Sequence, residues 1–169
     1  MNAYTADRAF SDRFLPAICA AVGPRLLVPA PFELDCKQAT DLVVLTARNM
    51  AIAARVRKWY YSHGYPCQFT IRAHRDSGAE TELSKIVAGF GDWLFYGFSN
   101  KAGDGSGFAL WYIIDLHVFR AFREGVPMTA NGDGTHFCAY DIGKFPRELI
   151  IASWADDRLS KVLKKHKII

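Results

Sequence analysis

The chain lacks the cysteine spacing that marks zinc-stabilised or disulfide-rich proteins. Its four cysteines, Cys19, Cys36, Cys67 and Cys138, form no CxxC pair, and the closest His/Cys spacing is His136-Phe-Cys138. A structural zinc site normally takes two closely spaced ligand pairs, so this spacing argues against such a site. Free thiols in a reducing compartment are the better interpretation.

The sequence also shows no pattern typical of a secretory leader and no long apolar run. No basic stretch followed by an apolar one opens the chain, and no run approaches the roughly 20 apolar residues of a membrane-spanning helix. We therefore expect a soluble, cytoplasmic protein without a membrane partner.

Glycine-rich phosphate motifs and nucleophile motifs are missing as well. The chain contains no GxSxG, no GxxxxGK[ST] and no dinucleotide-type glycine run. Serine-hydrolase, P-loop and Rossmann functions therefore lack their local signatures.

Acidic residues are absent from residues 51–75, although this stretch is rich in cations and aromatic rings. Cations contact phosphates and rings stack on bases, so the pattern predicts a nucleic-acid surface. The residues predicted to form it are Arg55, Arg57, Lys58, Trp59, Arg72 and Arg75. The net charge of +4 permits a polyanionic partner without requiring one. The alternative is that the rings pack as the rim of the core.

The remaining pattern predicts one α+β domain over residues 1–169, with half of the residues hydrophobic. Apolar spacing predicts a helix over 10–22 that kinks at Pro16 or begins near it, and a second helix behind a Ser77/Glu80 capping box. The predicted strands are 42–45 and 51–56, joined as a hairpin, then 68–75, 93–98 and 108–116. Asp115 is expected to cap a short helix.

The last part of the chain, 123–169, is expected to extend a core formed by residues 10–122. A strand over 135–142, at a sheet edge, and a final helix capped at Ser153 are predicted there. Four lysines crowd the end of that helix, where its dipole favours cations.

The order helix, strands, helix, strand, strand over residues 10–122 resembles the core of the PD-(D/E)XK, or restriction-endonuclease-like, superfamily. The resemblance implies a central mixed sheet of about five strands flanked by helices. It implies Mg²⁺ or Mn²⁺ bound by Asp41 together with Glu33 or Asp35, and phosphodiester hydrolysis. The chain is also similar in its compact, aromatic-rich character to proteins of phages and mobile elements.

The resemblance implies an acid and a lysine two residues apart on the third strand of the core, and this chain departs from that motif. Residues 51–57 contain no acid, and the lysine of the motif is replaced by Arg55 or Arg57. Arginine stays protonated and cannot act as a base, but it can clamp a phosphate. The catalytic candidates are therefore Asp41, Arg55 and Arg57, with arginine as a phosphate clamp.

Two functions follow from these residues. The first is a metal-dependent nuclease, acting on DNA more readily than on RNA. The second is a non-catalytic module or inhibitor that keeps the nuclease-like scaffold and binds nucleic acid or a protein partner. An α+β domain with a small-molecule pocket is a third interpretation. An exposed aromatic surface would also suit a homodimer interface.

Overall fold

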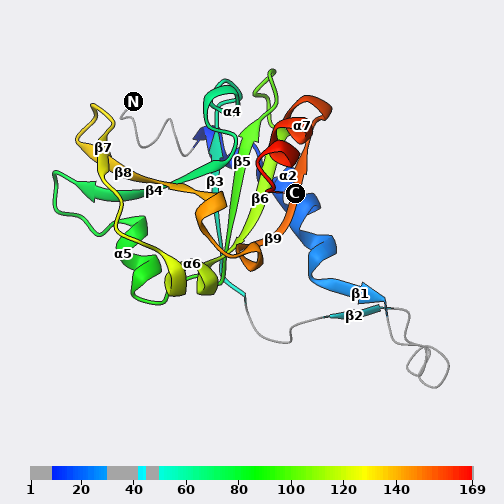
Figure 1. The fold of residues 1–169 in the computed structure, drawn as a ribbon, viewed down its shortest axis with the longest axis horizontal. Helices are drawn as coiled ribbons and strands as arrows, with labels where there is room; N and C mark the ends of the chain where they lie inside the picture. Colours follow the sequence, from blue (N-terminus) through cyan, green and yellow to red (C-terminus); the bar gives the residue numbers. More distant parts are fainter. Residues whose placement is uncertain (1–8, 30–41, 45–49, 169) are drawn as a thin grey trace.

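The computed structural model describes residues 9–29, 42–44 and 50–168 and has a layered α+β architecture (Figure 1). Its strands form a four-stranded sheet in the order β3-β5-β6-β9, a three-stranded sheet in the order β4-β8-β7, and a two-stranded ladder of β1 and β2. The predicted α+β class is confirmed. The single sheet of about five strands is wrong, because the strands divide between separate sheets.

The four-stranded sheet is the middle layer of the molecule. Its strands are β3 (Ile52–Arg57), β5 (Trp93–Ser99), β6 (Phe108–Asp115) and β9 (Ile150–Ala155). β3 and β5 run parallel, whereas the other pairs are antiparallel. Every residue of β5 after Trp93 is buried, because side chains cover both faces of this inner strand. Burial on both faces explains why the strand is an unbroken apolar run rather than an alternating one.

The predicted hairpin of strands 42–45 and 51–56 is wrong. β2 (Leu42–Val44) pairs antiparallel with β1 (Leu27–Pro29), and β3 pairs with β5 instead. Pairing with β5 places β3 against a strand that is buried on both faces. The turn expected at Arg48 and Asn49 lies outside the described residues.

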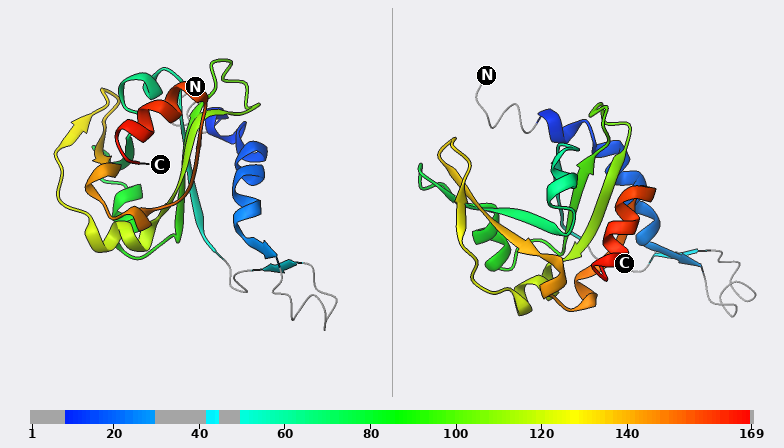
Figure 2. Two further views of the ribbon diagram at one scale, coloured as in Figure 1. Left: turned by 45° about the vertical axis from the view of Figure 1, so that its right-hand side comes forward. Right: turned by 45° about the horizontal axis from the view of Figure 1, so that its top comes forward.

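One face of the four-stranded sheet is covered by α2 (Leu15–Val22), as Figure 2 shows. Phe14, Ile18 and Val22 share an apolar cluster with Val56 and other residues of the sheet. Phe14 is the N-cap and a proline stands in the first turn, so the helix begins near Pro16, which was one of the two predicted alternatives. The short helix η1 (Gly23–Arg25) follows it.

The opposite face packs against the three-stranded sheet and the remaining helices. That sheet comprises β4 (Gln68–Arg75), β7 (Met128–Ala130) and β8 (Thr135–Asp141). Phe69, Phe119, Tyr140 and Phe145 form a ring cluster with neighbouring centroids 4.9 to 6.3 Å apart. α6 (Leu116–Phe122) and α7 (Asp157–Lys165) complete this side through Phe119, Leu159 and Leu163.

Helix starts differ from the predicted ones at two of three positions. Asp115 caps α6 as predicted, accepting hydrogen bonds from the backbone of His117 and Val118. α5 (Glu82–Val87) instead uses Thr81 in its capping box, and α7 is capped by Asp156. Ser153, the predicted cap of α7, lies inside β9, a strand that the sequence pattern did not predict.

Residues 123–169 contribute to both main sheets. β8 lies between β4 and β7, not at an edge as predicted, and β9 pairs with β6. The short helices η2 (Ile142–Lys144) and η3 (Arg147–Leu149) connect them. Among the described residues, no helix is long and apolar enough to cross a membrane.

Candidate nucleic-acid interface

Five of the six residues predicted to bind nucleic acid line one groove of about 940 Å³. Arg55, Arg57 and Lys58 come from β3 and the residue after it, and Arg72 and Arg75 come from β4. Both strands are edges of their sheets in the described part of the chain, so the groove lies along one edge of each sheet. We call this surface the basic groove.

Strand alternation places the arginines of β3 in the groove. Arg55 and Arg57 are two residues apart and share one face of the strand. Val56 points to the other face and is buried in the cluster with α2. The single apolar residue between two arginines therefore orients both guanidinium groups toward the second sheet.

Glu82 anchors Arg55 at the wall of the groove. The Arg55 guanidinium lies 2.8 Å from the Glu82 carboxylate, and the two side chains are only 16% and 26% exposed. The same carboxylate accepts a hydrogen bond from the backbone N–H of Arg72 on β4. One ion pair leaves further N–H donors on a guanidinium, which has five. Arg55 is thus a fixed cation that retains donors for another acceptor.

Arg57 is held by an aromatic ring instead of an acid. Its guanidinium carbon lies 4.3 Å from the centroid of the Tyr61 ring, a cation–π distance. Tyr61 begins α4 (Tyr61–Gly64), and its ring lies 4.5 Å from that of Tyr60, which is 49% exposed. A side-chain hydrogen bond with Tyr61, together with burial, raises the pKa of Tyr60, so the phenol is neutral at ordinary pH. The pair offers an uncharged aromatic surface beside a cation.

Two further cations reach the groove from distant parts of the chain. Arg13 precedes α2, and Lys85 lies on α5. The loop after β5 approaches Arg13 closely at Gly105, where φ is +91° and an added Cβ would lie 2.5 Å from the Arg13 carbonyl oxygen. Glycine is needed there both for its backbone conformation and for this approach. Sequence reasoning missed Arg13 and Lys85, because no local pattern relates them to β3 or β4.

Acidic side chains are present in the groove but are outnumbered. Seven cationic and four acidic residues line it. Among the acids, Asp133 accepts hydrogen bonds from the Thr135 hydroxyl and backbone N–H, which lower its pKa and keep it ionised. The groove therefore carries a surplus of positive charge.

Trp59, the sixth predicted residue, does not line the groove. Its ring contacts the edge of His63, with centroids 4.5 Å apart, and the Lys101 ammonium lies 5.8 Å from its centroid. Its backbone N–H donates to the Ser99 hydroxyl. These contacts attach the start of α4 to the end of β5, which is a structural role.

The predicted metal ligands Glu33, Asp35 and Asp41 all lie outside the described residues. Their placement opposite Arg55 and Arg57 depended on the hairpin that β2 and β3 do not form. The described part of the basic groove brings no three potential metal ligands together. The Mg²⁺ or Mn²⁺ site therefore stays a prediction from the sequence.

Comparison with known proteins gives no match: no family model, no curated protein and no solved structure is significantly similar to the chain.

Proposed function

We propose that the protein binds single-stranded nucleic acid in the basic groove without hydrolysing it. The observation that carries this proposal is the convergence of seven cations, from α5, β3, β4 and the segment before α2, on one groove beside the Tyr60 and Tyr61 rings. Cations that follow a backbone, combined with rings that stack on bases, are the usual means of binding single strands.

A groove between two sheet edges suits an extended strand. Arg57, Lys58, Arg72 and Arg75 provide cations along both walls, and Tyr60 provides an exposed ring. Sequence-specific recognition of a duplex would require an element inserted into a groove of the DNA. DNA stays the expected form of the strand, as the sequence suggested, and the proposed contacts are to backbone and base faces rather than to base edges.

Binding without turnover is the better match to the described groove. Glu82 is engaged by Arg55 and by the backbone of β4. Hydrolysis by a bound divalent ion would depend on Glu33, Asp35 and Asp41, and the restriction-endonuclease-like resemblance that suggests them rests on element order alone.

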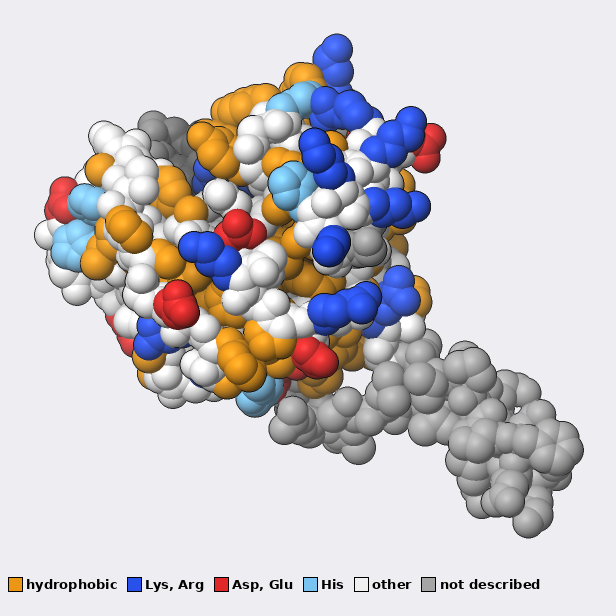
Figure 3. Space-filling view, viewed as in Figure 1, with side chains coloured by type: hydrophobic (Ala, Val, Ile, Leu, Met, Phe, Trp, Pro, Cys, Tyr) orange, Lys and Arg blue, Asp and Glu red, His pale blue; other side chains and the backbone are white. Residues whose placement is uncertain are grey.

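The test is fluorescence anisotropy of a labelled oligonucleotide over a range of salt concentrations. The double variant Arg57→Ala/Lys58→Ala should bind several-fold more weakly. Its plot of log K against log salt should be shallower by about 0.7 for each phosphate that the variant no longer neutralises. Lys164→Ala is the matched control, because Lys164 is an exposed cation on α7, where basic side chains also gather (Figure 3).

Other results would replace the proposal. Unchanged affinity and slope in the double variant, or loss of binding in Lys164→Ala, would remove the groove as the binding surface. A mononucleotide that competes as strongly as the oligonucleotide would favour a small-molecule pocket. Cleavage of the strand with Mn²⁺, abolished by Asp41→Asn, would establish the nuclease instead.

A further inference from the structure

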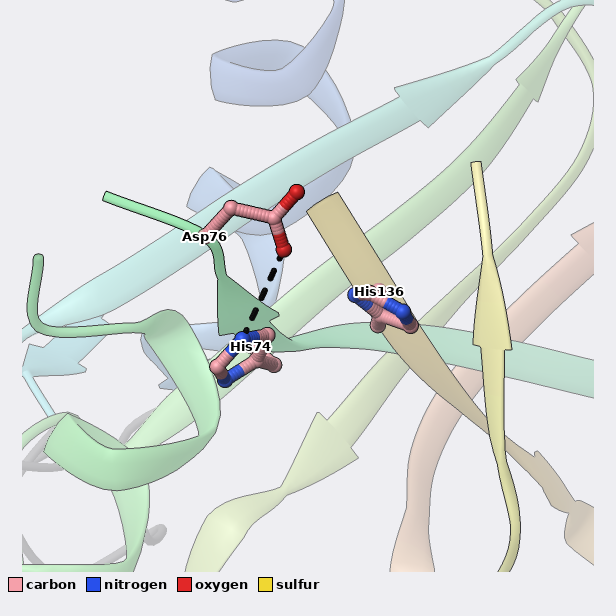
Figure 4. A group of neighbouring side chains, drawn as sticks. All are labelled: His74, Asp76 and His136. Atoms are coloured by element: carbon pink, nitrogen blue, oxygen red, sulfur yellow. Dashed lines mark ion pairs between the residues drawn. The ribbon is translucent and has the colours of Figure 1, made fainter. Parts of the chain in front are cut away.

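Three side chains with metal-binding atoms gather at the end of the three-stranded sheet where β4 ends and β8 begins. His74 lies near the end of β4, Asp76 follows that strand, and His136 lies near the start of β8 (Figure 4). One ligand atom from each residue lies within 4.8 Å of the others. None of the three residues lines the basic groove, so this cluster is separate from the proposed nucleic-acid surface.

A β-bulge brings the two histidines together. The register of β4 and β8 pairs Arg72 with Phe137 and His74 with His136, which leaves Ala73 as an extra residue. Because neighbouring residues of β8 point to opposite faces, His74 and Arg72 must also face opposite sides of the sheet. Without the bulge they would share a face. The extra residue therefore turns His74 away from the groove and toward His136, as bulges next to functional sites do.

Asp76 completes the cluster from a fixed backbone position. Its N–H donates to the carbonyl oxygen of Gly134 at 2.9 Å. Gly134 has φ of +74°, and an added Cβ there would lie 3.1 Å from the Asp76 carboxylate. The carboxylate oxygen lies 3.6 Å from Nε2 of His74, the ion pair drawn in Figure 4. Glycine at position 134 thus leaves the space that the carboxylate occupies.

His136 supplies a second, independent observation. Its Nδ1 is buried and has no hydrogen-bond partner among the described residues. The rings of His74 and His136 meet edge to face with centroids 5.3 Å apart, and one ring nitrogen of His136 faces the other two side chains in Figure 4. A buried polar atom without a partner destabilises the fold. Coordination of a metal ion through Nδ1 would remove that penalty.

The spacing is compatible with a metal ion after small side-chain movements. Two ligands of a tetrahedral zinc ion are about 3.4 Å apart, given Zn–N bonds of about 2.1 Å. The His74–Asp76 distance of 3.6 Å already meets this requirement. His74 and Asp76 side chains are 53% and 67% exposed, so both have room to rotate toward His136.

We propose that His74, Asp76 and His136 bind one zinc-class divalent ion. Two imidazoles with one carboxylate favour Zn²⁺ and neighbouring transition metals over Mg²⁺, which prefers oxygen ligands. Three protein ligands leave a fourth position for water or another ligand. The ion would join the end of β4 to the start of β8. Asn131 and Asp133, which line the basic groove, lie on the turn that leads into β8.

The experiment is calorimetric titration of ZnCl₂ into the full-length protein, with Co²⁺ absorption as a second readout. The wild type should bind one ion. His74→Ala, at an exposed position, and Asp76→Asn should each weaken binding by more than about tenfold, since loss of a group that only orients a metal ligand already weakens affinity by about 10- to 100-fold. His166→Ala removes an exposed histidine outside the cluster and should leave affinity unchanged. Circular dichroism checks that each variant is folded.

Zinc should also raise the melting temperature of the wild type and of His166→Ala but not that of His74→Ala. Absence of saturable Zn²⁺ binding to the wild type would overturn the proposal and leave the cluster as an ordinary ion pair beside a histidine. Equal Zn²⁺ affinity in wild type, His74→Ala and Asp76→Asn would overturn it too, because the ion would then bind elsewhere, for example at the exposed Cys19 thiol.

Discussion

Glu82 joins three parts of the fold at the wall of the basic groove. Its carboxylate contacts the Arg55 side chain of β3 and the backbone N–H of Arg72 on β4, while its own backbone begins α5. Because β4 is an edge strand among the described strands, no neighbouring strand pairs with it on this side. The Glu82 side chain, from the helix that follows β4, therefore accepts a hydrogen bond from this edge strand and also orients Arg55 in the groove.

Replacing Glu82 with glutamine should separate these roles. Glu82→Gln keeps an acceptor for the Arg72 N–H but loses the charge facing Arg55, and a hydrogen bond to a charged group contributes about 2 kcal/mol. We expect a loss of about that size in the free energy of unfolding, measured by urea denaturation. The same variant should bind oligonucleotide more tightly, since a negative charge leaves the groove.

Glu80→Gln is the matched control. Glu80 also lines the groove, but its side chain is 61% exposed and lies 4.0 Å from Lys85. Exposed pairs contribute little, so its stability should change by less than about 0.5 kcal/mol. Equal stability changes in both variants would show that Glu82 is not a special anchor.

The sequence predicted the groove cations better than their partners. A stretch of 25 residues without an acid was visible, and five of its cations line one groove. The sequence pattern alone gives Glu82 an ordinary place on the solvated side or in the first turn of its helix, where the dipole favours acids. Its contacts to β3 and β4 depend on tertiary packing, which no local spacing records.

The start of α5 differs from the prediction because its cap also packs against a strand. The sequence predicted a capping box of Ser77 with Glu80, and the helix uses Thr81 with Ser84 instead. The Thr81 hydroxyl also lies 3.4 Å from the Ala73 carbonyl oxygen of β4, and the residue is buried. The helix therefore begins where its cap also contacts the neighbouring strand.

Removal of this cap should destabilise the protein measurably. Thr81→Ala loses the hydroxyl that accepts from the Ser84 N–H, and such losses typically amount to about 1 kcal/mol. Thr81→Ser retains the hydroxyl and should stay closer to the wild type. Thermal and urea unfolding of the two variants provide the measurement. Identical losses in both would mean that the buried methyl group, rather than the cap, is responsible.

Strands were easier to find than to pair. The ranges 51–56, 68–75, 93–98 and 108–116 closely match β3, β4, β5 and β6. The partner of β3 was wrong, because a parallel pairing with β5 requires a crossover that contains β4 and α5. Short-range turn signals favour hairpins and carry no information on such a crossover.

The division into two packed sheets makes the stability of the entire molecule sensitive to alkaline pH. Tyr112 of β6 and Tyr140 of β8 are both almost fully buried in the core between the sheets. Burial raises the pKa of Tyr112 above its ordinary value, and its hydroxyl donates to the Pro66 carbonyl oxygen at 2.8 Å. Burial, followed by the effect of Cys138, raises the pKa of Tyr140 to about 12.

Stability should therefore fall as pH rises above about 10, the pKa of an unfolded tyrosine. Above that value the unfolded chain releases protons that the folded protein retains, so the free energy of unfolding decreases with pH. Below it the two tyrosines have no effect. Urea denaturation between pH 8 and 11 measures the trend. Tyr140→Phe should make the dependence less steep, and an unchanged slope would contradict the assignment.

The extra residue of β4, Ala73, lies between residues that belong to two different surfaces, the basic groove and the proposed metal site. Arg72 comes before it and lines the groove, and His74 comes after it and faces His136. Because of the bulge, the residues of β4 after Ala73 face the opposite side of the sheet from the one that strict alternation would give them. Deleting Ala73 would make Arg72 and His74 neighbours that still face opposite sides, so it should remove the bulge and leave both side chains on their present faces. The register of β4 against β8 therefore keeps the two sites distinct.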